Sequence, residues 1–420
     1  MATQEQKYQE AAERYLTLGV DVDKALRVLR GIPLSVHCWQ GDDVGGFETP
    51  DAELGGGGIQ VTGNYPGRAR SIDELRADLE KLYSILPGAH RLALHASYGE
   101  FGGKRIERDE ITPDLFEGWL QWAKANDVGL DFNSTFFSHP LADDGFTLSS
   151  KDAKIRDFWI EHAKRCREIS AFLGKGFGST CIHNVWIPDG TKDYPVDRMG
   201  HRTILRDSLD KVFEKDYPDT EMKDAVEAKL FGLGSEAYVV GSHEFYLGYA
   251  ISRGKIPCLD TGHFHPTELI ADKITSVLLF SNELLLHVSR PMRWDSDHVV
   301  IQSDEVRFLS EELIRSGRLD DVFIGLDFFD ASINRLGAWV IGSRSVLQTL
   351  LQALLQPHDR LLKYENEGNN FARLALIEEL KTMPFEPIWD RYCEEAGAPL
   401  NRNIIETVME YERSVQKSRG

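Results

Sequence analysis

Residues 256–288 read IPCLDTGHFHPTELIADKITSVLLFSNELLLHV and contain the pattern that decides the fold. Two short apolar runs, 256–260 and 284–288, flank a longer stretch of helical character. Short apolar runs between turn signals are typical of buried strands, and a helix between two strands joins them in parallel. Each run also carries an ionisable group near its C-terminal end, Asp260 in the first and His287 in the second. The unit therefore predicts a parallel sheet with ionisable side chains at one edge.

The same alternation extends over most of the chain. Amphipathic stretches such as 71–86, 114–127 and 154–174 separate the apolar runs, and Ser71 and Asp114 are the predicted N-caps of the first two. A doubly wound open sheet would also alternate in this way, but eight strands is the number that closes a barrel. We therefore expect an α/β fold, a (β/α)8 TIM barrel. The predicted strands are 34–39, 91–96, 128–133, 181–186, 226–231, 256–260, 284–288 and 322–328.

Helical segments flank the predicted barrel. Residues 4–30 carry apolar residues at helical spacing and predict one N-terminal amphipathic helix. Beyond about Ser343 the chain is wholly helical, which predicts a barrel domain at 1–342 and a helical extension at 343–420. We expect the extension to pack on the barrel or on a neighbouring subunit. The Gly-rich segment 54–67 lacks the GK[ST] of a phosphate-binding loop and is either a connection or a lid over the barrel mouth.

The composition excludes several classes of protein. The formal net charge of -19 over 420 residues disfavours a nucleic-acid partner, because phosphate binding needs a basic face. Five scattered cysteines without a CxxC pair argue against a disulfide framework and for a reducing compartment. The first residues lack the apolar core of a secretory signal, and no apolar run approaches the roughly 18 residues of a membrane span. We expect a soluble cytoplasmic protein with neither a nucleic-acid nor a membrane partner.

Ionisable residues gather at or near the C-terminal ends of the later strands. Such side chains converge on one mouth of a barrel, where the active sites of this fold lie. Burying five carboxylates together is costly unless cations neutralise them, so divalent metal is the expected solution. Oxygen and imidazole ligands without thiolate suit Mn²⁺, Mg²⁺ or Co²⁺ better than a Cys-rich structural zinc site. The seven residues are Glu227, Asp260, His263, His287, Asp295, Asp297 and Asp327.

Each of these residues also has a purely structural interpretation. A single Asp at a strand end is usually a helix N-cap, and a lone His in an apolar strand is more often hydrogen-bonded in the core, but the seven together are less easily explained in this way. Lys229, two residues after Glu227, shares its strand face and either adjoins the metals with a depressed pKa or forms an ordinary salt bridge. The pair His263 and His265 has the HxH spacing of metal-dependent amidohydrolases, but it follows the sixth strand instead of the first, so His265 is assigned a structural or supporting role.

Several longer motifs resemble the L-rhamnose isomerase family. They are HCWQGDD (37–43), GNYPG (63–67), FSHP (137–140), WIPDG (186–190), DAVEAKLFG (224–232), LDTGHFHPTE (259–268), LLLHVSRPMRWDSDHVV (284–300) and GLDFFDASINR (325–335). The resemblance covers essentially the whole chain, the helical tail included. It implies a metal-dependent (β/α)8 barrel, usually a homotetramer, that interconverts L-rhamnose and L-rhamnulose. The implied cofactors are two divalent metal ions per subunit, with Mn²⁺ expected and Zn²⁺, Co²⁺ or Mg²⁺ as alternatives.

The same resemblance assigns roles to individual residues. It implies a structural metal held by Glu227, Asp260, His287 and Asp327, and a catalytic metal held by His263, Asp295 and Asp297 together with Asp260. Trp39, Trp186 and His95 fall where the family lines its sugar pocket, and Phe137 is the candidate for an apolar wall. Aromatic rings suit this task because the C–H faces of a sugar are apolar, although core packing is the alternative. The expected catalytic residues are Lys229, Asp327 and His95.

The expected reaction moves one hydrogen between C1 and C2 and one proton between O1 and O2 of the open-chain sugar. The resemblance favours a metal-assisted 1,2-hydride shift, which needs no protein base at carbon, whereas a cis-enediol path needs a carboxylate beside C2. Three other functions stay as alternatives at this point. They are another two-metal barrel enzyme acting on a different sugar, a hydrolase of the HxH type and a non-catalytic sugar-binding protein.

Overall fold

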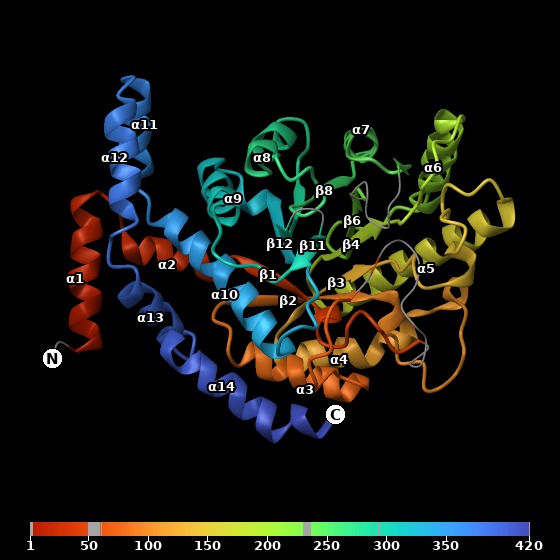
Figure 1. The fold of residues 1–420 in the computed structure, drawn as a ribbon, viewed down its shortest axis with the longest axis horizontal. Coiled ribbons are helices and arrows are strands. Elements are labelled where there is room, and N and C mark those ends of the chain that lie inside the picture. The colour runs from red at the N-terminus through yellow and green to blue at the C-terminus, as the bar shows by residue number, and fades with distance from the viewer. Residues whose placement is uncertain (1–2, 49–58, 60, 230–236, 293–294, 420) are drawn as a thin grey trace.

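Eight parallel strands close into a barrel with helices on its outside (Figure 1). The computed structural model describes residues 3–48, 59, 61–229, 237–292 and 295–419, with only the backbone of 295–297. The order around the barrel is β1-β12-β9-β8-β6-β4-β3-β2, so the last barrel strand closes the ring against the first and the predicted (β/α)8 barrel is confirmed. The strands are β1 (Pro33–His37), β2 (Ala89–His95), β3 (Gly129–Asn133), β4 (Cys181–Trp186), β6 (Met222–Glu227), β8 (Ile256–Asp260), β9 (Leu284–Val288) and β12 (Val322–Leu326).

The predicted strand positions are confirmed except at β6. That strand runs over Met222–Glu227 and not over 226–231, of which 230 and 231 lie outside the described residues. The prediction was wrong because Lys223 and Asp224 make the first half of the strand look polar. Asp224 is in fact buried, where it pairs with Arg167. A charged residue whose partner comes from a distant helix can therefore occupy a strand core.

Helices between the strands cover the outside of the barrel. Ser71 caps the first of them as predicted, because its hydroxyl accepts a hydrogen bond from the backbone N–H of Glu74 at 3.2 Å. Asp114 does not cap α4, since a 3-10 turn at Pro113–Phe116 precedes that helix and contains Asp114. The covering helices are α3 (Ile72–Tyr83), α4 (Glu117–Asn126), α5 (Ala153–Phe177), α6 (Arg198–Val212), α7 (His243–Arg253), α8 (Ala271–Leu278), α9 (Asp304–Arg315) and α10 (Arg335–Leu354).

The N-terminal segment forms two helices and not the single helix predicted at 4–30. The first, α1 (Gln4–Thr17), ends before Gly19, whose φ of 88° lies in the left-handed region and breaks the helix. Asp21 then accepts a hydrogen bond from the backbone N–H of Lys24 at 2.8 Å and caps α2 (Val22–Arg30). The break lets each helix turn its own apolar face towards the core.

The chain continues as helices after the barrel. The expected boundary between 342 and 343 falls inside α10, so the last barrel helix crosses it without interruption, and the division into two domains stays a prediction. In Figure 1 the next two helices project together on one side, and the final two run below the barrel towards α3. Tyr411 donates a hydrogen bond to Asp78 of α3 at 2.7 Å. These helices are α11 (His358–Asn366), α12 (Asn370–Leu380), α13 (Glu386–Glu395) and α14 (Asn401–Ser414).

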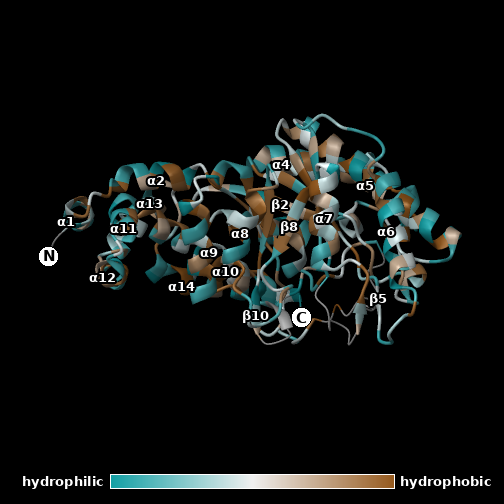
Figure 2. Ribbon diagram, turned by 90° about the horizontal axis from the view of Figure 1, so that it is seen from above, coloured by the Kyte–Doolittle hydropathy of each residue, from teal (hydrophilic) through white to brown (hydrophobic). Residues whose placement is uncertain are grey.

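Apolar side chains fill the space between the barrel and its helices in three clusters, and a smaller cluster lies inside the barrel. The hydrophobic colouring in Figure 2 is concentrated around β2 and β8, at the centre of this arrangement. The five cysteines are all buried and unpaired, as predicted for a chain without a disulfide framework. In the part of the chain that the structure describes, no helix combines the length and apolarity needed to cross a membrane.

A buried ion pair joins β6 to α5. Asp224 accepts two hydrogen bonds of 2.9 Å from the guanidinium of Arg167, and Lys255 Nζ lies 3.0 Å from the same carboxylate. His183 Nδ1 lies 3.1 Å from Asp224 Oδ1. Burial alone would raise the pKa of Asp224, but the hydrogen bond with His183 and the charge of Arg167 hold that pKa well below its ordinary value. The carboxylate is therefore ionised in the fold and neutralises the positive charges of Arg167 and Lys255.

We expect Asp224→Asn to lower the free energy of unfolding by about 3–5 kcal/mol, because the change leaves Arg167 buried without its counter-charge. Asp210→Asn is the matched control. Asp210 and Arg253 form a similar pair at 3.0 Å, but their side chains are 39% and 41% exposed. Pairs this exposed are worth about 0–1 kcal/mol. Urea unfolding of both variants measures the difference, and equal losses would contradict a special role for the buried pair.

Candidate active site and metal centre

A pocket of about 70 Å³ lies at the C-terminal ends of the barrel strands, where active sites of this fold are found. A larger cavity of about 190 Å³ lies deeper in the barrel. We place the candidate site in the mouth pocket because it combines aromatic rings with predicted carboxylate and imidazole groups. The predicted residues that line it are Trp39, His95, Phe137, Trp186, Glu227, His263 and Asp327.

Four of the predicted metal ligands converge beside this pocket. Each offers one donor atom, and these atoms all lie within 4.8 Å of one another. Three neighbouring barrel strands bring them together, since Glu227 ends β6, Asp260 ends β8 and His287 lies in β9. Asp327 directly follows β12. The four residues, which we call the ligand cluster, could hold a metal ion.

Two buried imidazole nitrogens at this site have no directed hydrogen bond to any residue that the structure describes. His287 Nδ1 lies 3.1 Å from Glu227 Oε2, and His263 Nδ1 lies 3.1 Å from Glu227 Oε1, but neither contact is a directed hydrogen bond. Leaving a buried polar atom unsatisfied costs about 1–3 kcal/mol. Imidazole nitrogen and carboxylate oxygen are common ligands of divalent cations. The orphaned nitrogens therefore fit a site that takes a metal ion.

Neighbouring charges and burial shift the pKa values of the ionisable groups at this site. Burial raises the pKa of Asp260 to about 6. Burial would lower the pKa of His263, but the carboxylates of Asp260 and Glu227 outweigh it and raise that pKa to about 10. For Glu227 the imidazoles of His287 and His263 outweigh burial and lower the pKa well below its ordinary value. Without a metal ion, protons on the imidazoles balance the carboxylates, and a bound cation would displace such protons.

Cys258 lies beside the ligand cluster. Its sulfur belongs to a second group of donor atoms, with Glu227 and His287, that also lie within 4.8 Å of one another. Burial raises the pKa of the Cys258 thiol well above its ordinary value. The thiolate and not the thiol is the form that ligates a metal, so Cys258 is a poor ligand here. Oxygen and imidazole donors remain the set that fits.

Two residues without a distinctive sequence pattern orient the ligand cluster. Asn184 of β4 donates from Nδ2 to Glu227 Oε2 at 2.5 Å. Ser289 donates from Oγ to Asp260 Oδ1 at 2.8 Å. Partners of this kind fix the direction of ligating groups and tune metal affinity. The sequence held no signal for either residue, because both contacts depend on the register between strands.

The remaining predicted ligands, Asp295 and Asp297, lie on a hairpin that follows β9. The hairpin consists of β10 (Arg290–Met292) and β11 (Asp295–His298), which pair antiparallel. The side chains of Asp295 and Asp297 lie outside the described part of the structure. Their backbone follows the C-terminal end of a barrel strand, the end at which the ligand cluster lies. A second metal position with these two ligands therefore stays a prediction.

The predicted substrate-binding residues form one aromatic wall of the mouth pocket. The ring of His95 lies 4.8 Å from Trp39 and 5.5 Å from Phe137, both in edge-to-face arrangement. Phe137 in turn lies 6.2 Å from Trp186. Trp39 follows β1 and His95 ends β2, while Phe137 follows β3 and Trp186 ends β4. Four successive strands therefore build the wall. Such a wall suits the C–H face of a sugar.

Polar atoms on this wall are placed for hydroxyl groups. Trp186 Nε1 is buried and has no hydrogen-bond partner among the described residues, so a ligand oxygen would satisfy it. Trp39 Nε1 donates to Asp327 Oδ1 at 3.1 Å and joins the wall to the ligand cluster. Burial lowers the pKa of His95 to about 4, so the ring is neutral near pH 7. Its Nδ1 lies 3.1 Å from Thr135 Oγ1, which fixes the orientation of the ring.

Lys229 is buried and lies two residues after Glu227 in the chain. The sequence placed Lys229 on the same strand face as Glu227, because side chains alternate along a strand. The strand ends at Glu227, so Lys229 lies beyond it and this reasoning does not apply. Lys229 Nζ donates to the backbone oxygen of Pro188 at 2.8 Å, and its backbone N–H donates to Gly241 O at 3.3 Å. Its participation in catalysis stays a prediction.

The loop after Trp39 contributes a pocket residue that the sequence did not reveal. Asp43 and Val44 have φ values of 61° and 60°, and strain of this kind costs about 1–3 kcal/mol per residue. Two hydrogen bonds of 2.7 Å from Arg335 hold Asp43 in place, and Val44 lines the pocket. Of the Gly-rich segment, 54–58 and 60 lie outside the described residues, so the lid interpretation is not tested, although Ile59 lines the pocket.

Comparison with known proteins gives matches over the whole chain. A family model described as L-rhamnose isomerase (RhaA) matches residues 2–419. The L-rhamnose isomerase of Rhodopirellula baltica is 55% identical over 416 residues, which cover 99% of this chain and 97% of that protein. The L-rhamnose isomerase of Salmonella agona is 53% identical over 421 residues, which cover 100% of both. A solved structure of L-ribulose 3-epimerase has a TM-score of 0.50 at 11% identity over 76% of this chain and 95% of that chain, a likeness of fold alone.

We expect Mn²⁺ to raise the melting temperature of the wild type but not of Glu227→Gln, because the amide removes a charged donor from the ligand cluster. A ligand at a hundred times its Kd stabilises the folded state by about 2.7 kcal/mol. Glu311→Gln is the control, since Glu311 is also buried but lies on α9, where it contacts Gln356. Thermal unfolding with and without Mn²⁺ measures the effect. An equal response of both variants would remove Glu227 from the metal site.

Proposed function

The chain belongs to the L-rhamnose isomerase family, a family of aldose–ketose isomerases, and we propose that it interconverts L-rhamnose and L-rhamnulose. The observation that carries the proposal is the convergence of the ligand cluster beside an aromatic-walled pocket. The cluster offers donors for a cation, and the wall offers apolar faces for carbon-bound hydrogens. An open-chain sugar presents oxygens and C–H faces that match the two halves of this site.

The proposed cofactors are two divalent metal ions per subunit, with Mn²⁺ as the expected ion and Zn²⁺, Co²⁺ or Mg²⁺ as alternatives. When bound, such ions polarise a carbonyl and stabilise a developing alkoxide, which would assist a 1,2-hydride shift in the open-chain sugar. The proposed ligands of the structural ion are Glu227, Asp260, His287 and Asp327, and those of the catalytic ion are His263, Asp295 and Asp297 with Asp260. The orphaned nitrogens of His263 and His287 support this assignment.

The chain's own side chains would bind and orient the sugar. Trp39, Trp186 and Phe137 would pack against its C–H faces and exclude water, while Trp186 Nε1 would donate to a hydroxyl. Neutral His95 would exchange hydrogen bonds with the sugar through Nε2, because Nδ1 lies beside Thr135. Asp327, whose carboxylate accepts a hydrogen bond from Trp39 Nε1, would position one end of the reacting part of the sugar. Lys229 would donate a hydrogen bond to a sugar oxygen, and Lys229, Asp327 and His95 are the proposed catalytic residues.

The proposal extends to a cytoplasmic homotetramer in which the helical extension at 343–420 supplies subunit contacts. Phe371 is 83% exposed and Leu374 59% exposed on α12, and Leu362 is 57% exposed on α11, which contacts α12. Large apolar side chains gathered on one projecting pair of helices support an interaction surface. Five buried free thiols support a reducing compartment.

We expect the purified protein to convert L-rhamnose to a ketose, to lose that activity after chelation and to regain it with Mn²⁺. The reason is that the ligand cluster supplies donors for the ion that the reaction requires. Ketose detection on a panel of aldoses, with and without added Mn²⁺, Co²⁺, Zn²⁺ or Mg²⁺, checks the expectation. A preference for another sugar would indicate a related isomerase or epimerase, and full activity in the metal-free protein would contradict the proposal.

We expect L-rhamnose labelled with deuterium at C2 to keep the label in the ketose product. In a hydride shift the hydrogen passes directly between C2 and C1, whereas an enediol path releases it to a base that exchanges with water. Mass spectrometry of the product formed early in the reaction measures the retained fraction. Complete washout of deuterium would contradict the hydride shift while leaving the isomerase activity itself intact.

A further inference from the structure

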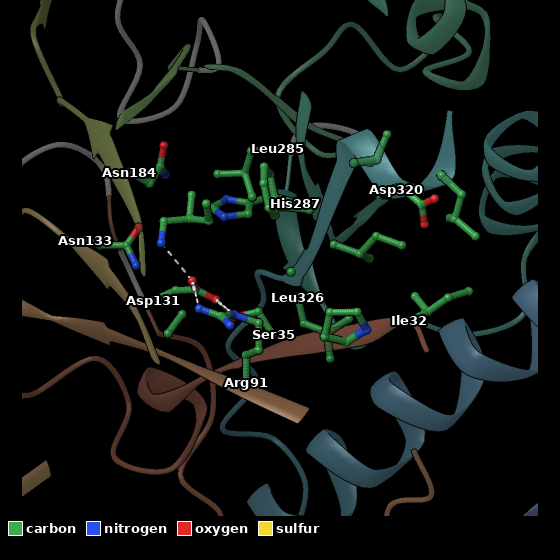
Figure 3. A pocket seen from close by; sticks show the side chains of 18 of the residues that line it. Ile32, Ser35, Arg91, Asp131, Asn133, Asn184, Leu285, His287, Asp320 and Leu326 are labelled. Atoms are coloured by element: carbon green, nitrogen blue, oxygen red, sulfur yellow. Dashed lines mark hydrogen bonds and ion pairs between the residues drawn. The ribbon is translucent and has the colours of Figure 1, made fainter. Parts of the chain in front are cut away.

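The interior of the barrel is hollow beneath the ligand cluster. Barrels of this fold normally fill their interior with layers of large branched side chains. Here the adjacent strands β12, β1 and β2 place the small residues Gly325, Ser35 and Ala93 on the inner face. These residues line the cavity of about 190 Å³, which Figure 3 shows from close by. The missing side-chain volume therefore opens a space along one side of the barrel.

The wall of this cavity is polar on one side. Asp131 accepts hydrogen bonds from Ser35 Oγ at 2.7 Å and from Arg91 Nε at 2.9 Å, and Figure 3 shows these three side chains together. Leu285 and Phe323 contribute apolar surface to the remaining wall. About 15 Å³ of cavity volume is enough to hold one water molecule, provided that polar partners are present. The cavity therefore has both the volume and the polar groups for several waters.

The residues that line the cavity extend from the N-terminal face of the barrel to the candidate site. At its lower end it is lined by Gly31, Pro33 and Asp320, which are exposed at the N-terminal side of β1 and β12. At its upper end Asn133 and Asn184 line both this cavity and the mouth pocket. His287 of the ligand cluster also lines the cavity. One continuous set of residues thus connects the N-terminal face of the barrel with the cluster.

Asn184 links the cavity to the cluster by hydrogen bonding. Its side chain is buried, with 3% of the residue exposed, and Nδ2 donates to Glu227 Oε2. Its Oδ1 is buried and accepts no hydrogen bond from the part of the chain that the structure describes. Buried amide oxygens normally accept a hydrogen bond from protein or from ordered water. A water molecule in the adjoining cavity would supply the donor and hold the amide with its nitrogen towards Glu227.

We propose that the cavity is a permanent water duct that connects the ligand cluster with solvent at the N-terminal end of the barrel. The inference rests on the proposed function, because it assigns the duct to the same site. A sugar in the mouth pocket fills the space between the aromatic rings and closes that route to water. The duct lets displaced water leave at the N-terminal end of the barrel. It also keeps water in contact with Asn184 while substrate is bound.

The test on the wild-type protein measures water exchange at the cluster after the mouth is filled. Protein loaded with Mn²⁺ speeds the relaxation of bulk-water protons only if water near the ion exchanges with solvent. L-Rhamnitol, the open-chain alcohol of L-rhamnose, is added to saturation to fill the mouth. We expect only a partial loss of the relaxation enhancement, because the duct still exchanges water. Loss of the entire enhancement would overturn the duct, whereas failure to retain Mn²⁺ would overturn the proposed function and the duct with it.

Variants at Ala93 isolate the duct from the mouth. Ala93→Leu fills the cavity from an inward-facing position without changing a proposed ligand, and Ala93→Ser is the matched control that leaves space for water. With L-rhamnitol bound, we expect Ala93→Leu to lose the remaining relaxation enhancement and Ala93→Ser to keep it, at equal Mn²⁺ content. Equal enhancement in the two variants would sink the proposal. Thermal unfolding verifies that both fold, and the wild-type measurement decides alone if Ala93→Leu does not.

Discussion

Three carboxylates approach one another in a buried part of the barrel, and this crowding of negative charge is the constraint on which the site depends. Glu227, Asp260 and Asp327 place donor atoms within 4.8 Å of one another and of His287. Buried carboxylates this close cannot all stay ionised without positive charge among them. Burial raises the pKa of Asp260, and the neighbouring carboxylates raise the pKa of His263. A divalent cation resolves the same conflict, which is why the cluster indicates a metal centre.

Strand register turns this chemical requirement into geometry. In the parallel ladder Asp260 lies opposite His287, and His287 lies opposite Gly325. A Cβ atom at position 325 would meet His287 Cδ2 at 3.3 Å, so the absence of a side chain there gives the imidazole its place. Small inner residues that make room for ligands also leave the barrel incompletely filled. The small residues on the inner face of the barrel therefore account both for the cavity and for the room that the ligand cluster occupies.

The site and the family indicate the function, because the barrel alone is compatible with many activities. The L-ribulose 3-epimerase structure shares the barrel at 11% identity, which says nothing about the reaction of this chain. Two L-rhamnose isomerases above 50% identity match it over nearly their whole length, the helical extension included. The aromatic wall and the ligand cluster add the chemical reason that a sugar and a cation would meet in this pocket.

The order of strands, the closed barrel and the gathering of ionisable groups at strand ends followed from the sequence, because short apolar runs and fold rules depend on local pattern. The prediction from local pattern was wrong at β6, because the charged Asp224 lies in a buried strand. It was also wrong at Gly19, which divides one expected helix into two. Only the tertiary structure decided that Asn184 orients Glu227, that Val44 lines the pocket and that the barrel interior is hollow. These features depend on register and packing between segments distant in the chain, which no local pattern encodes.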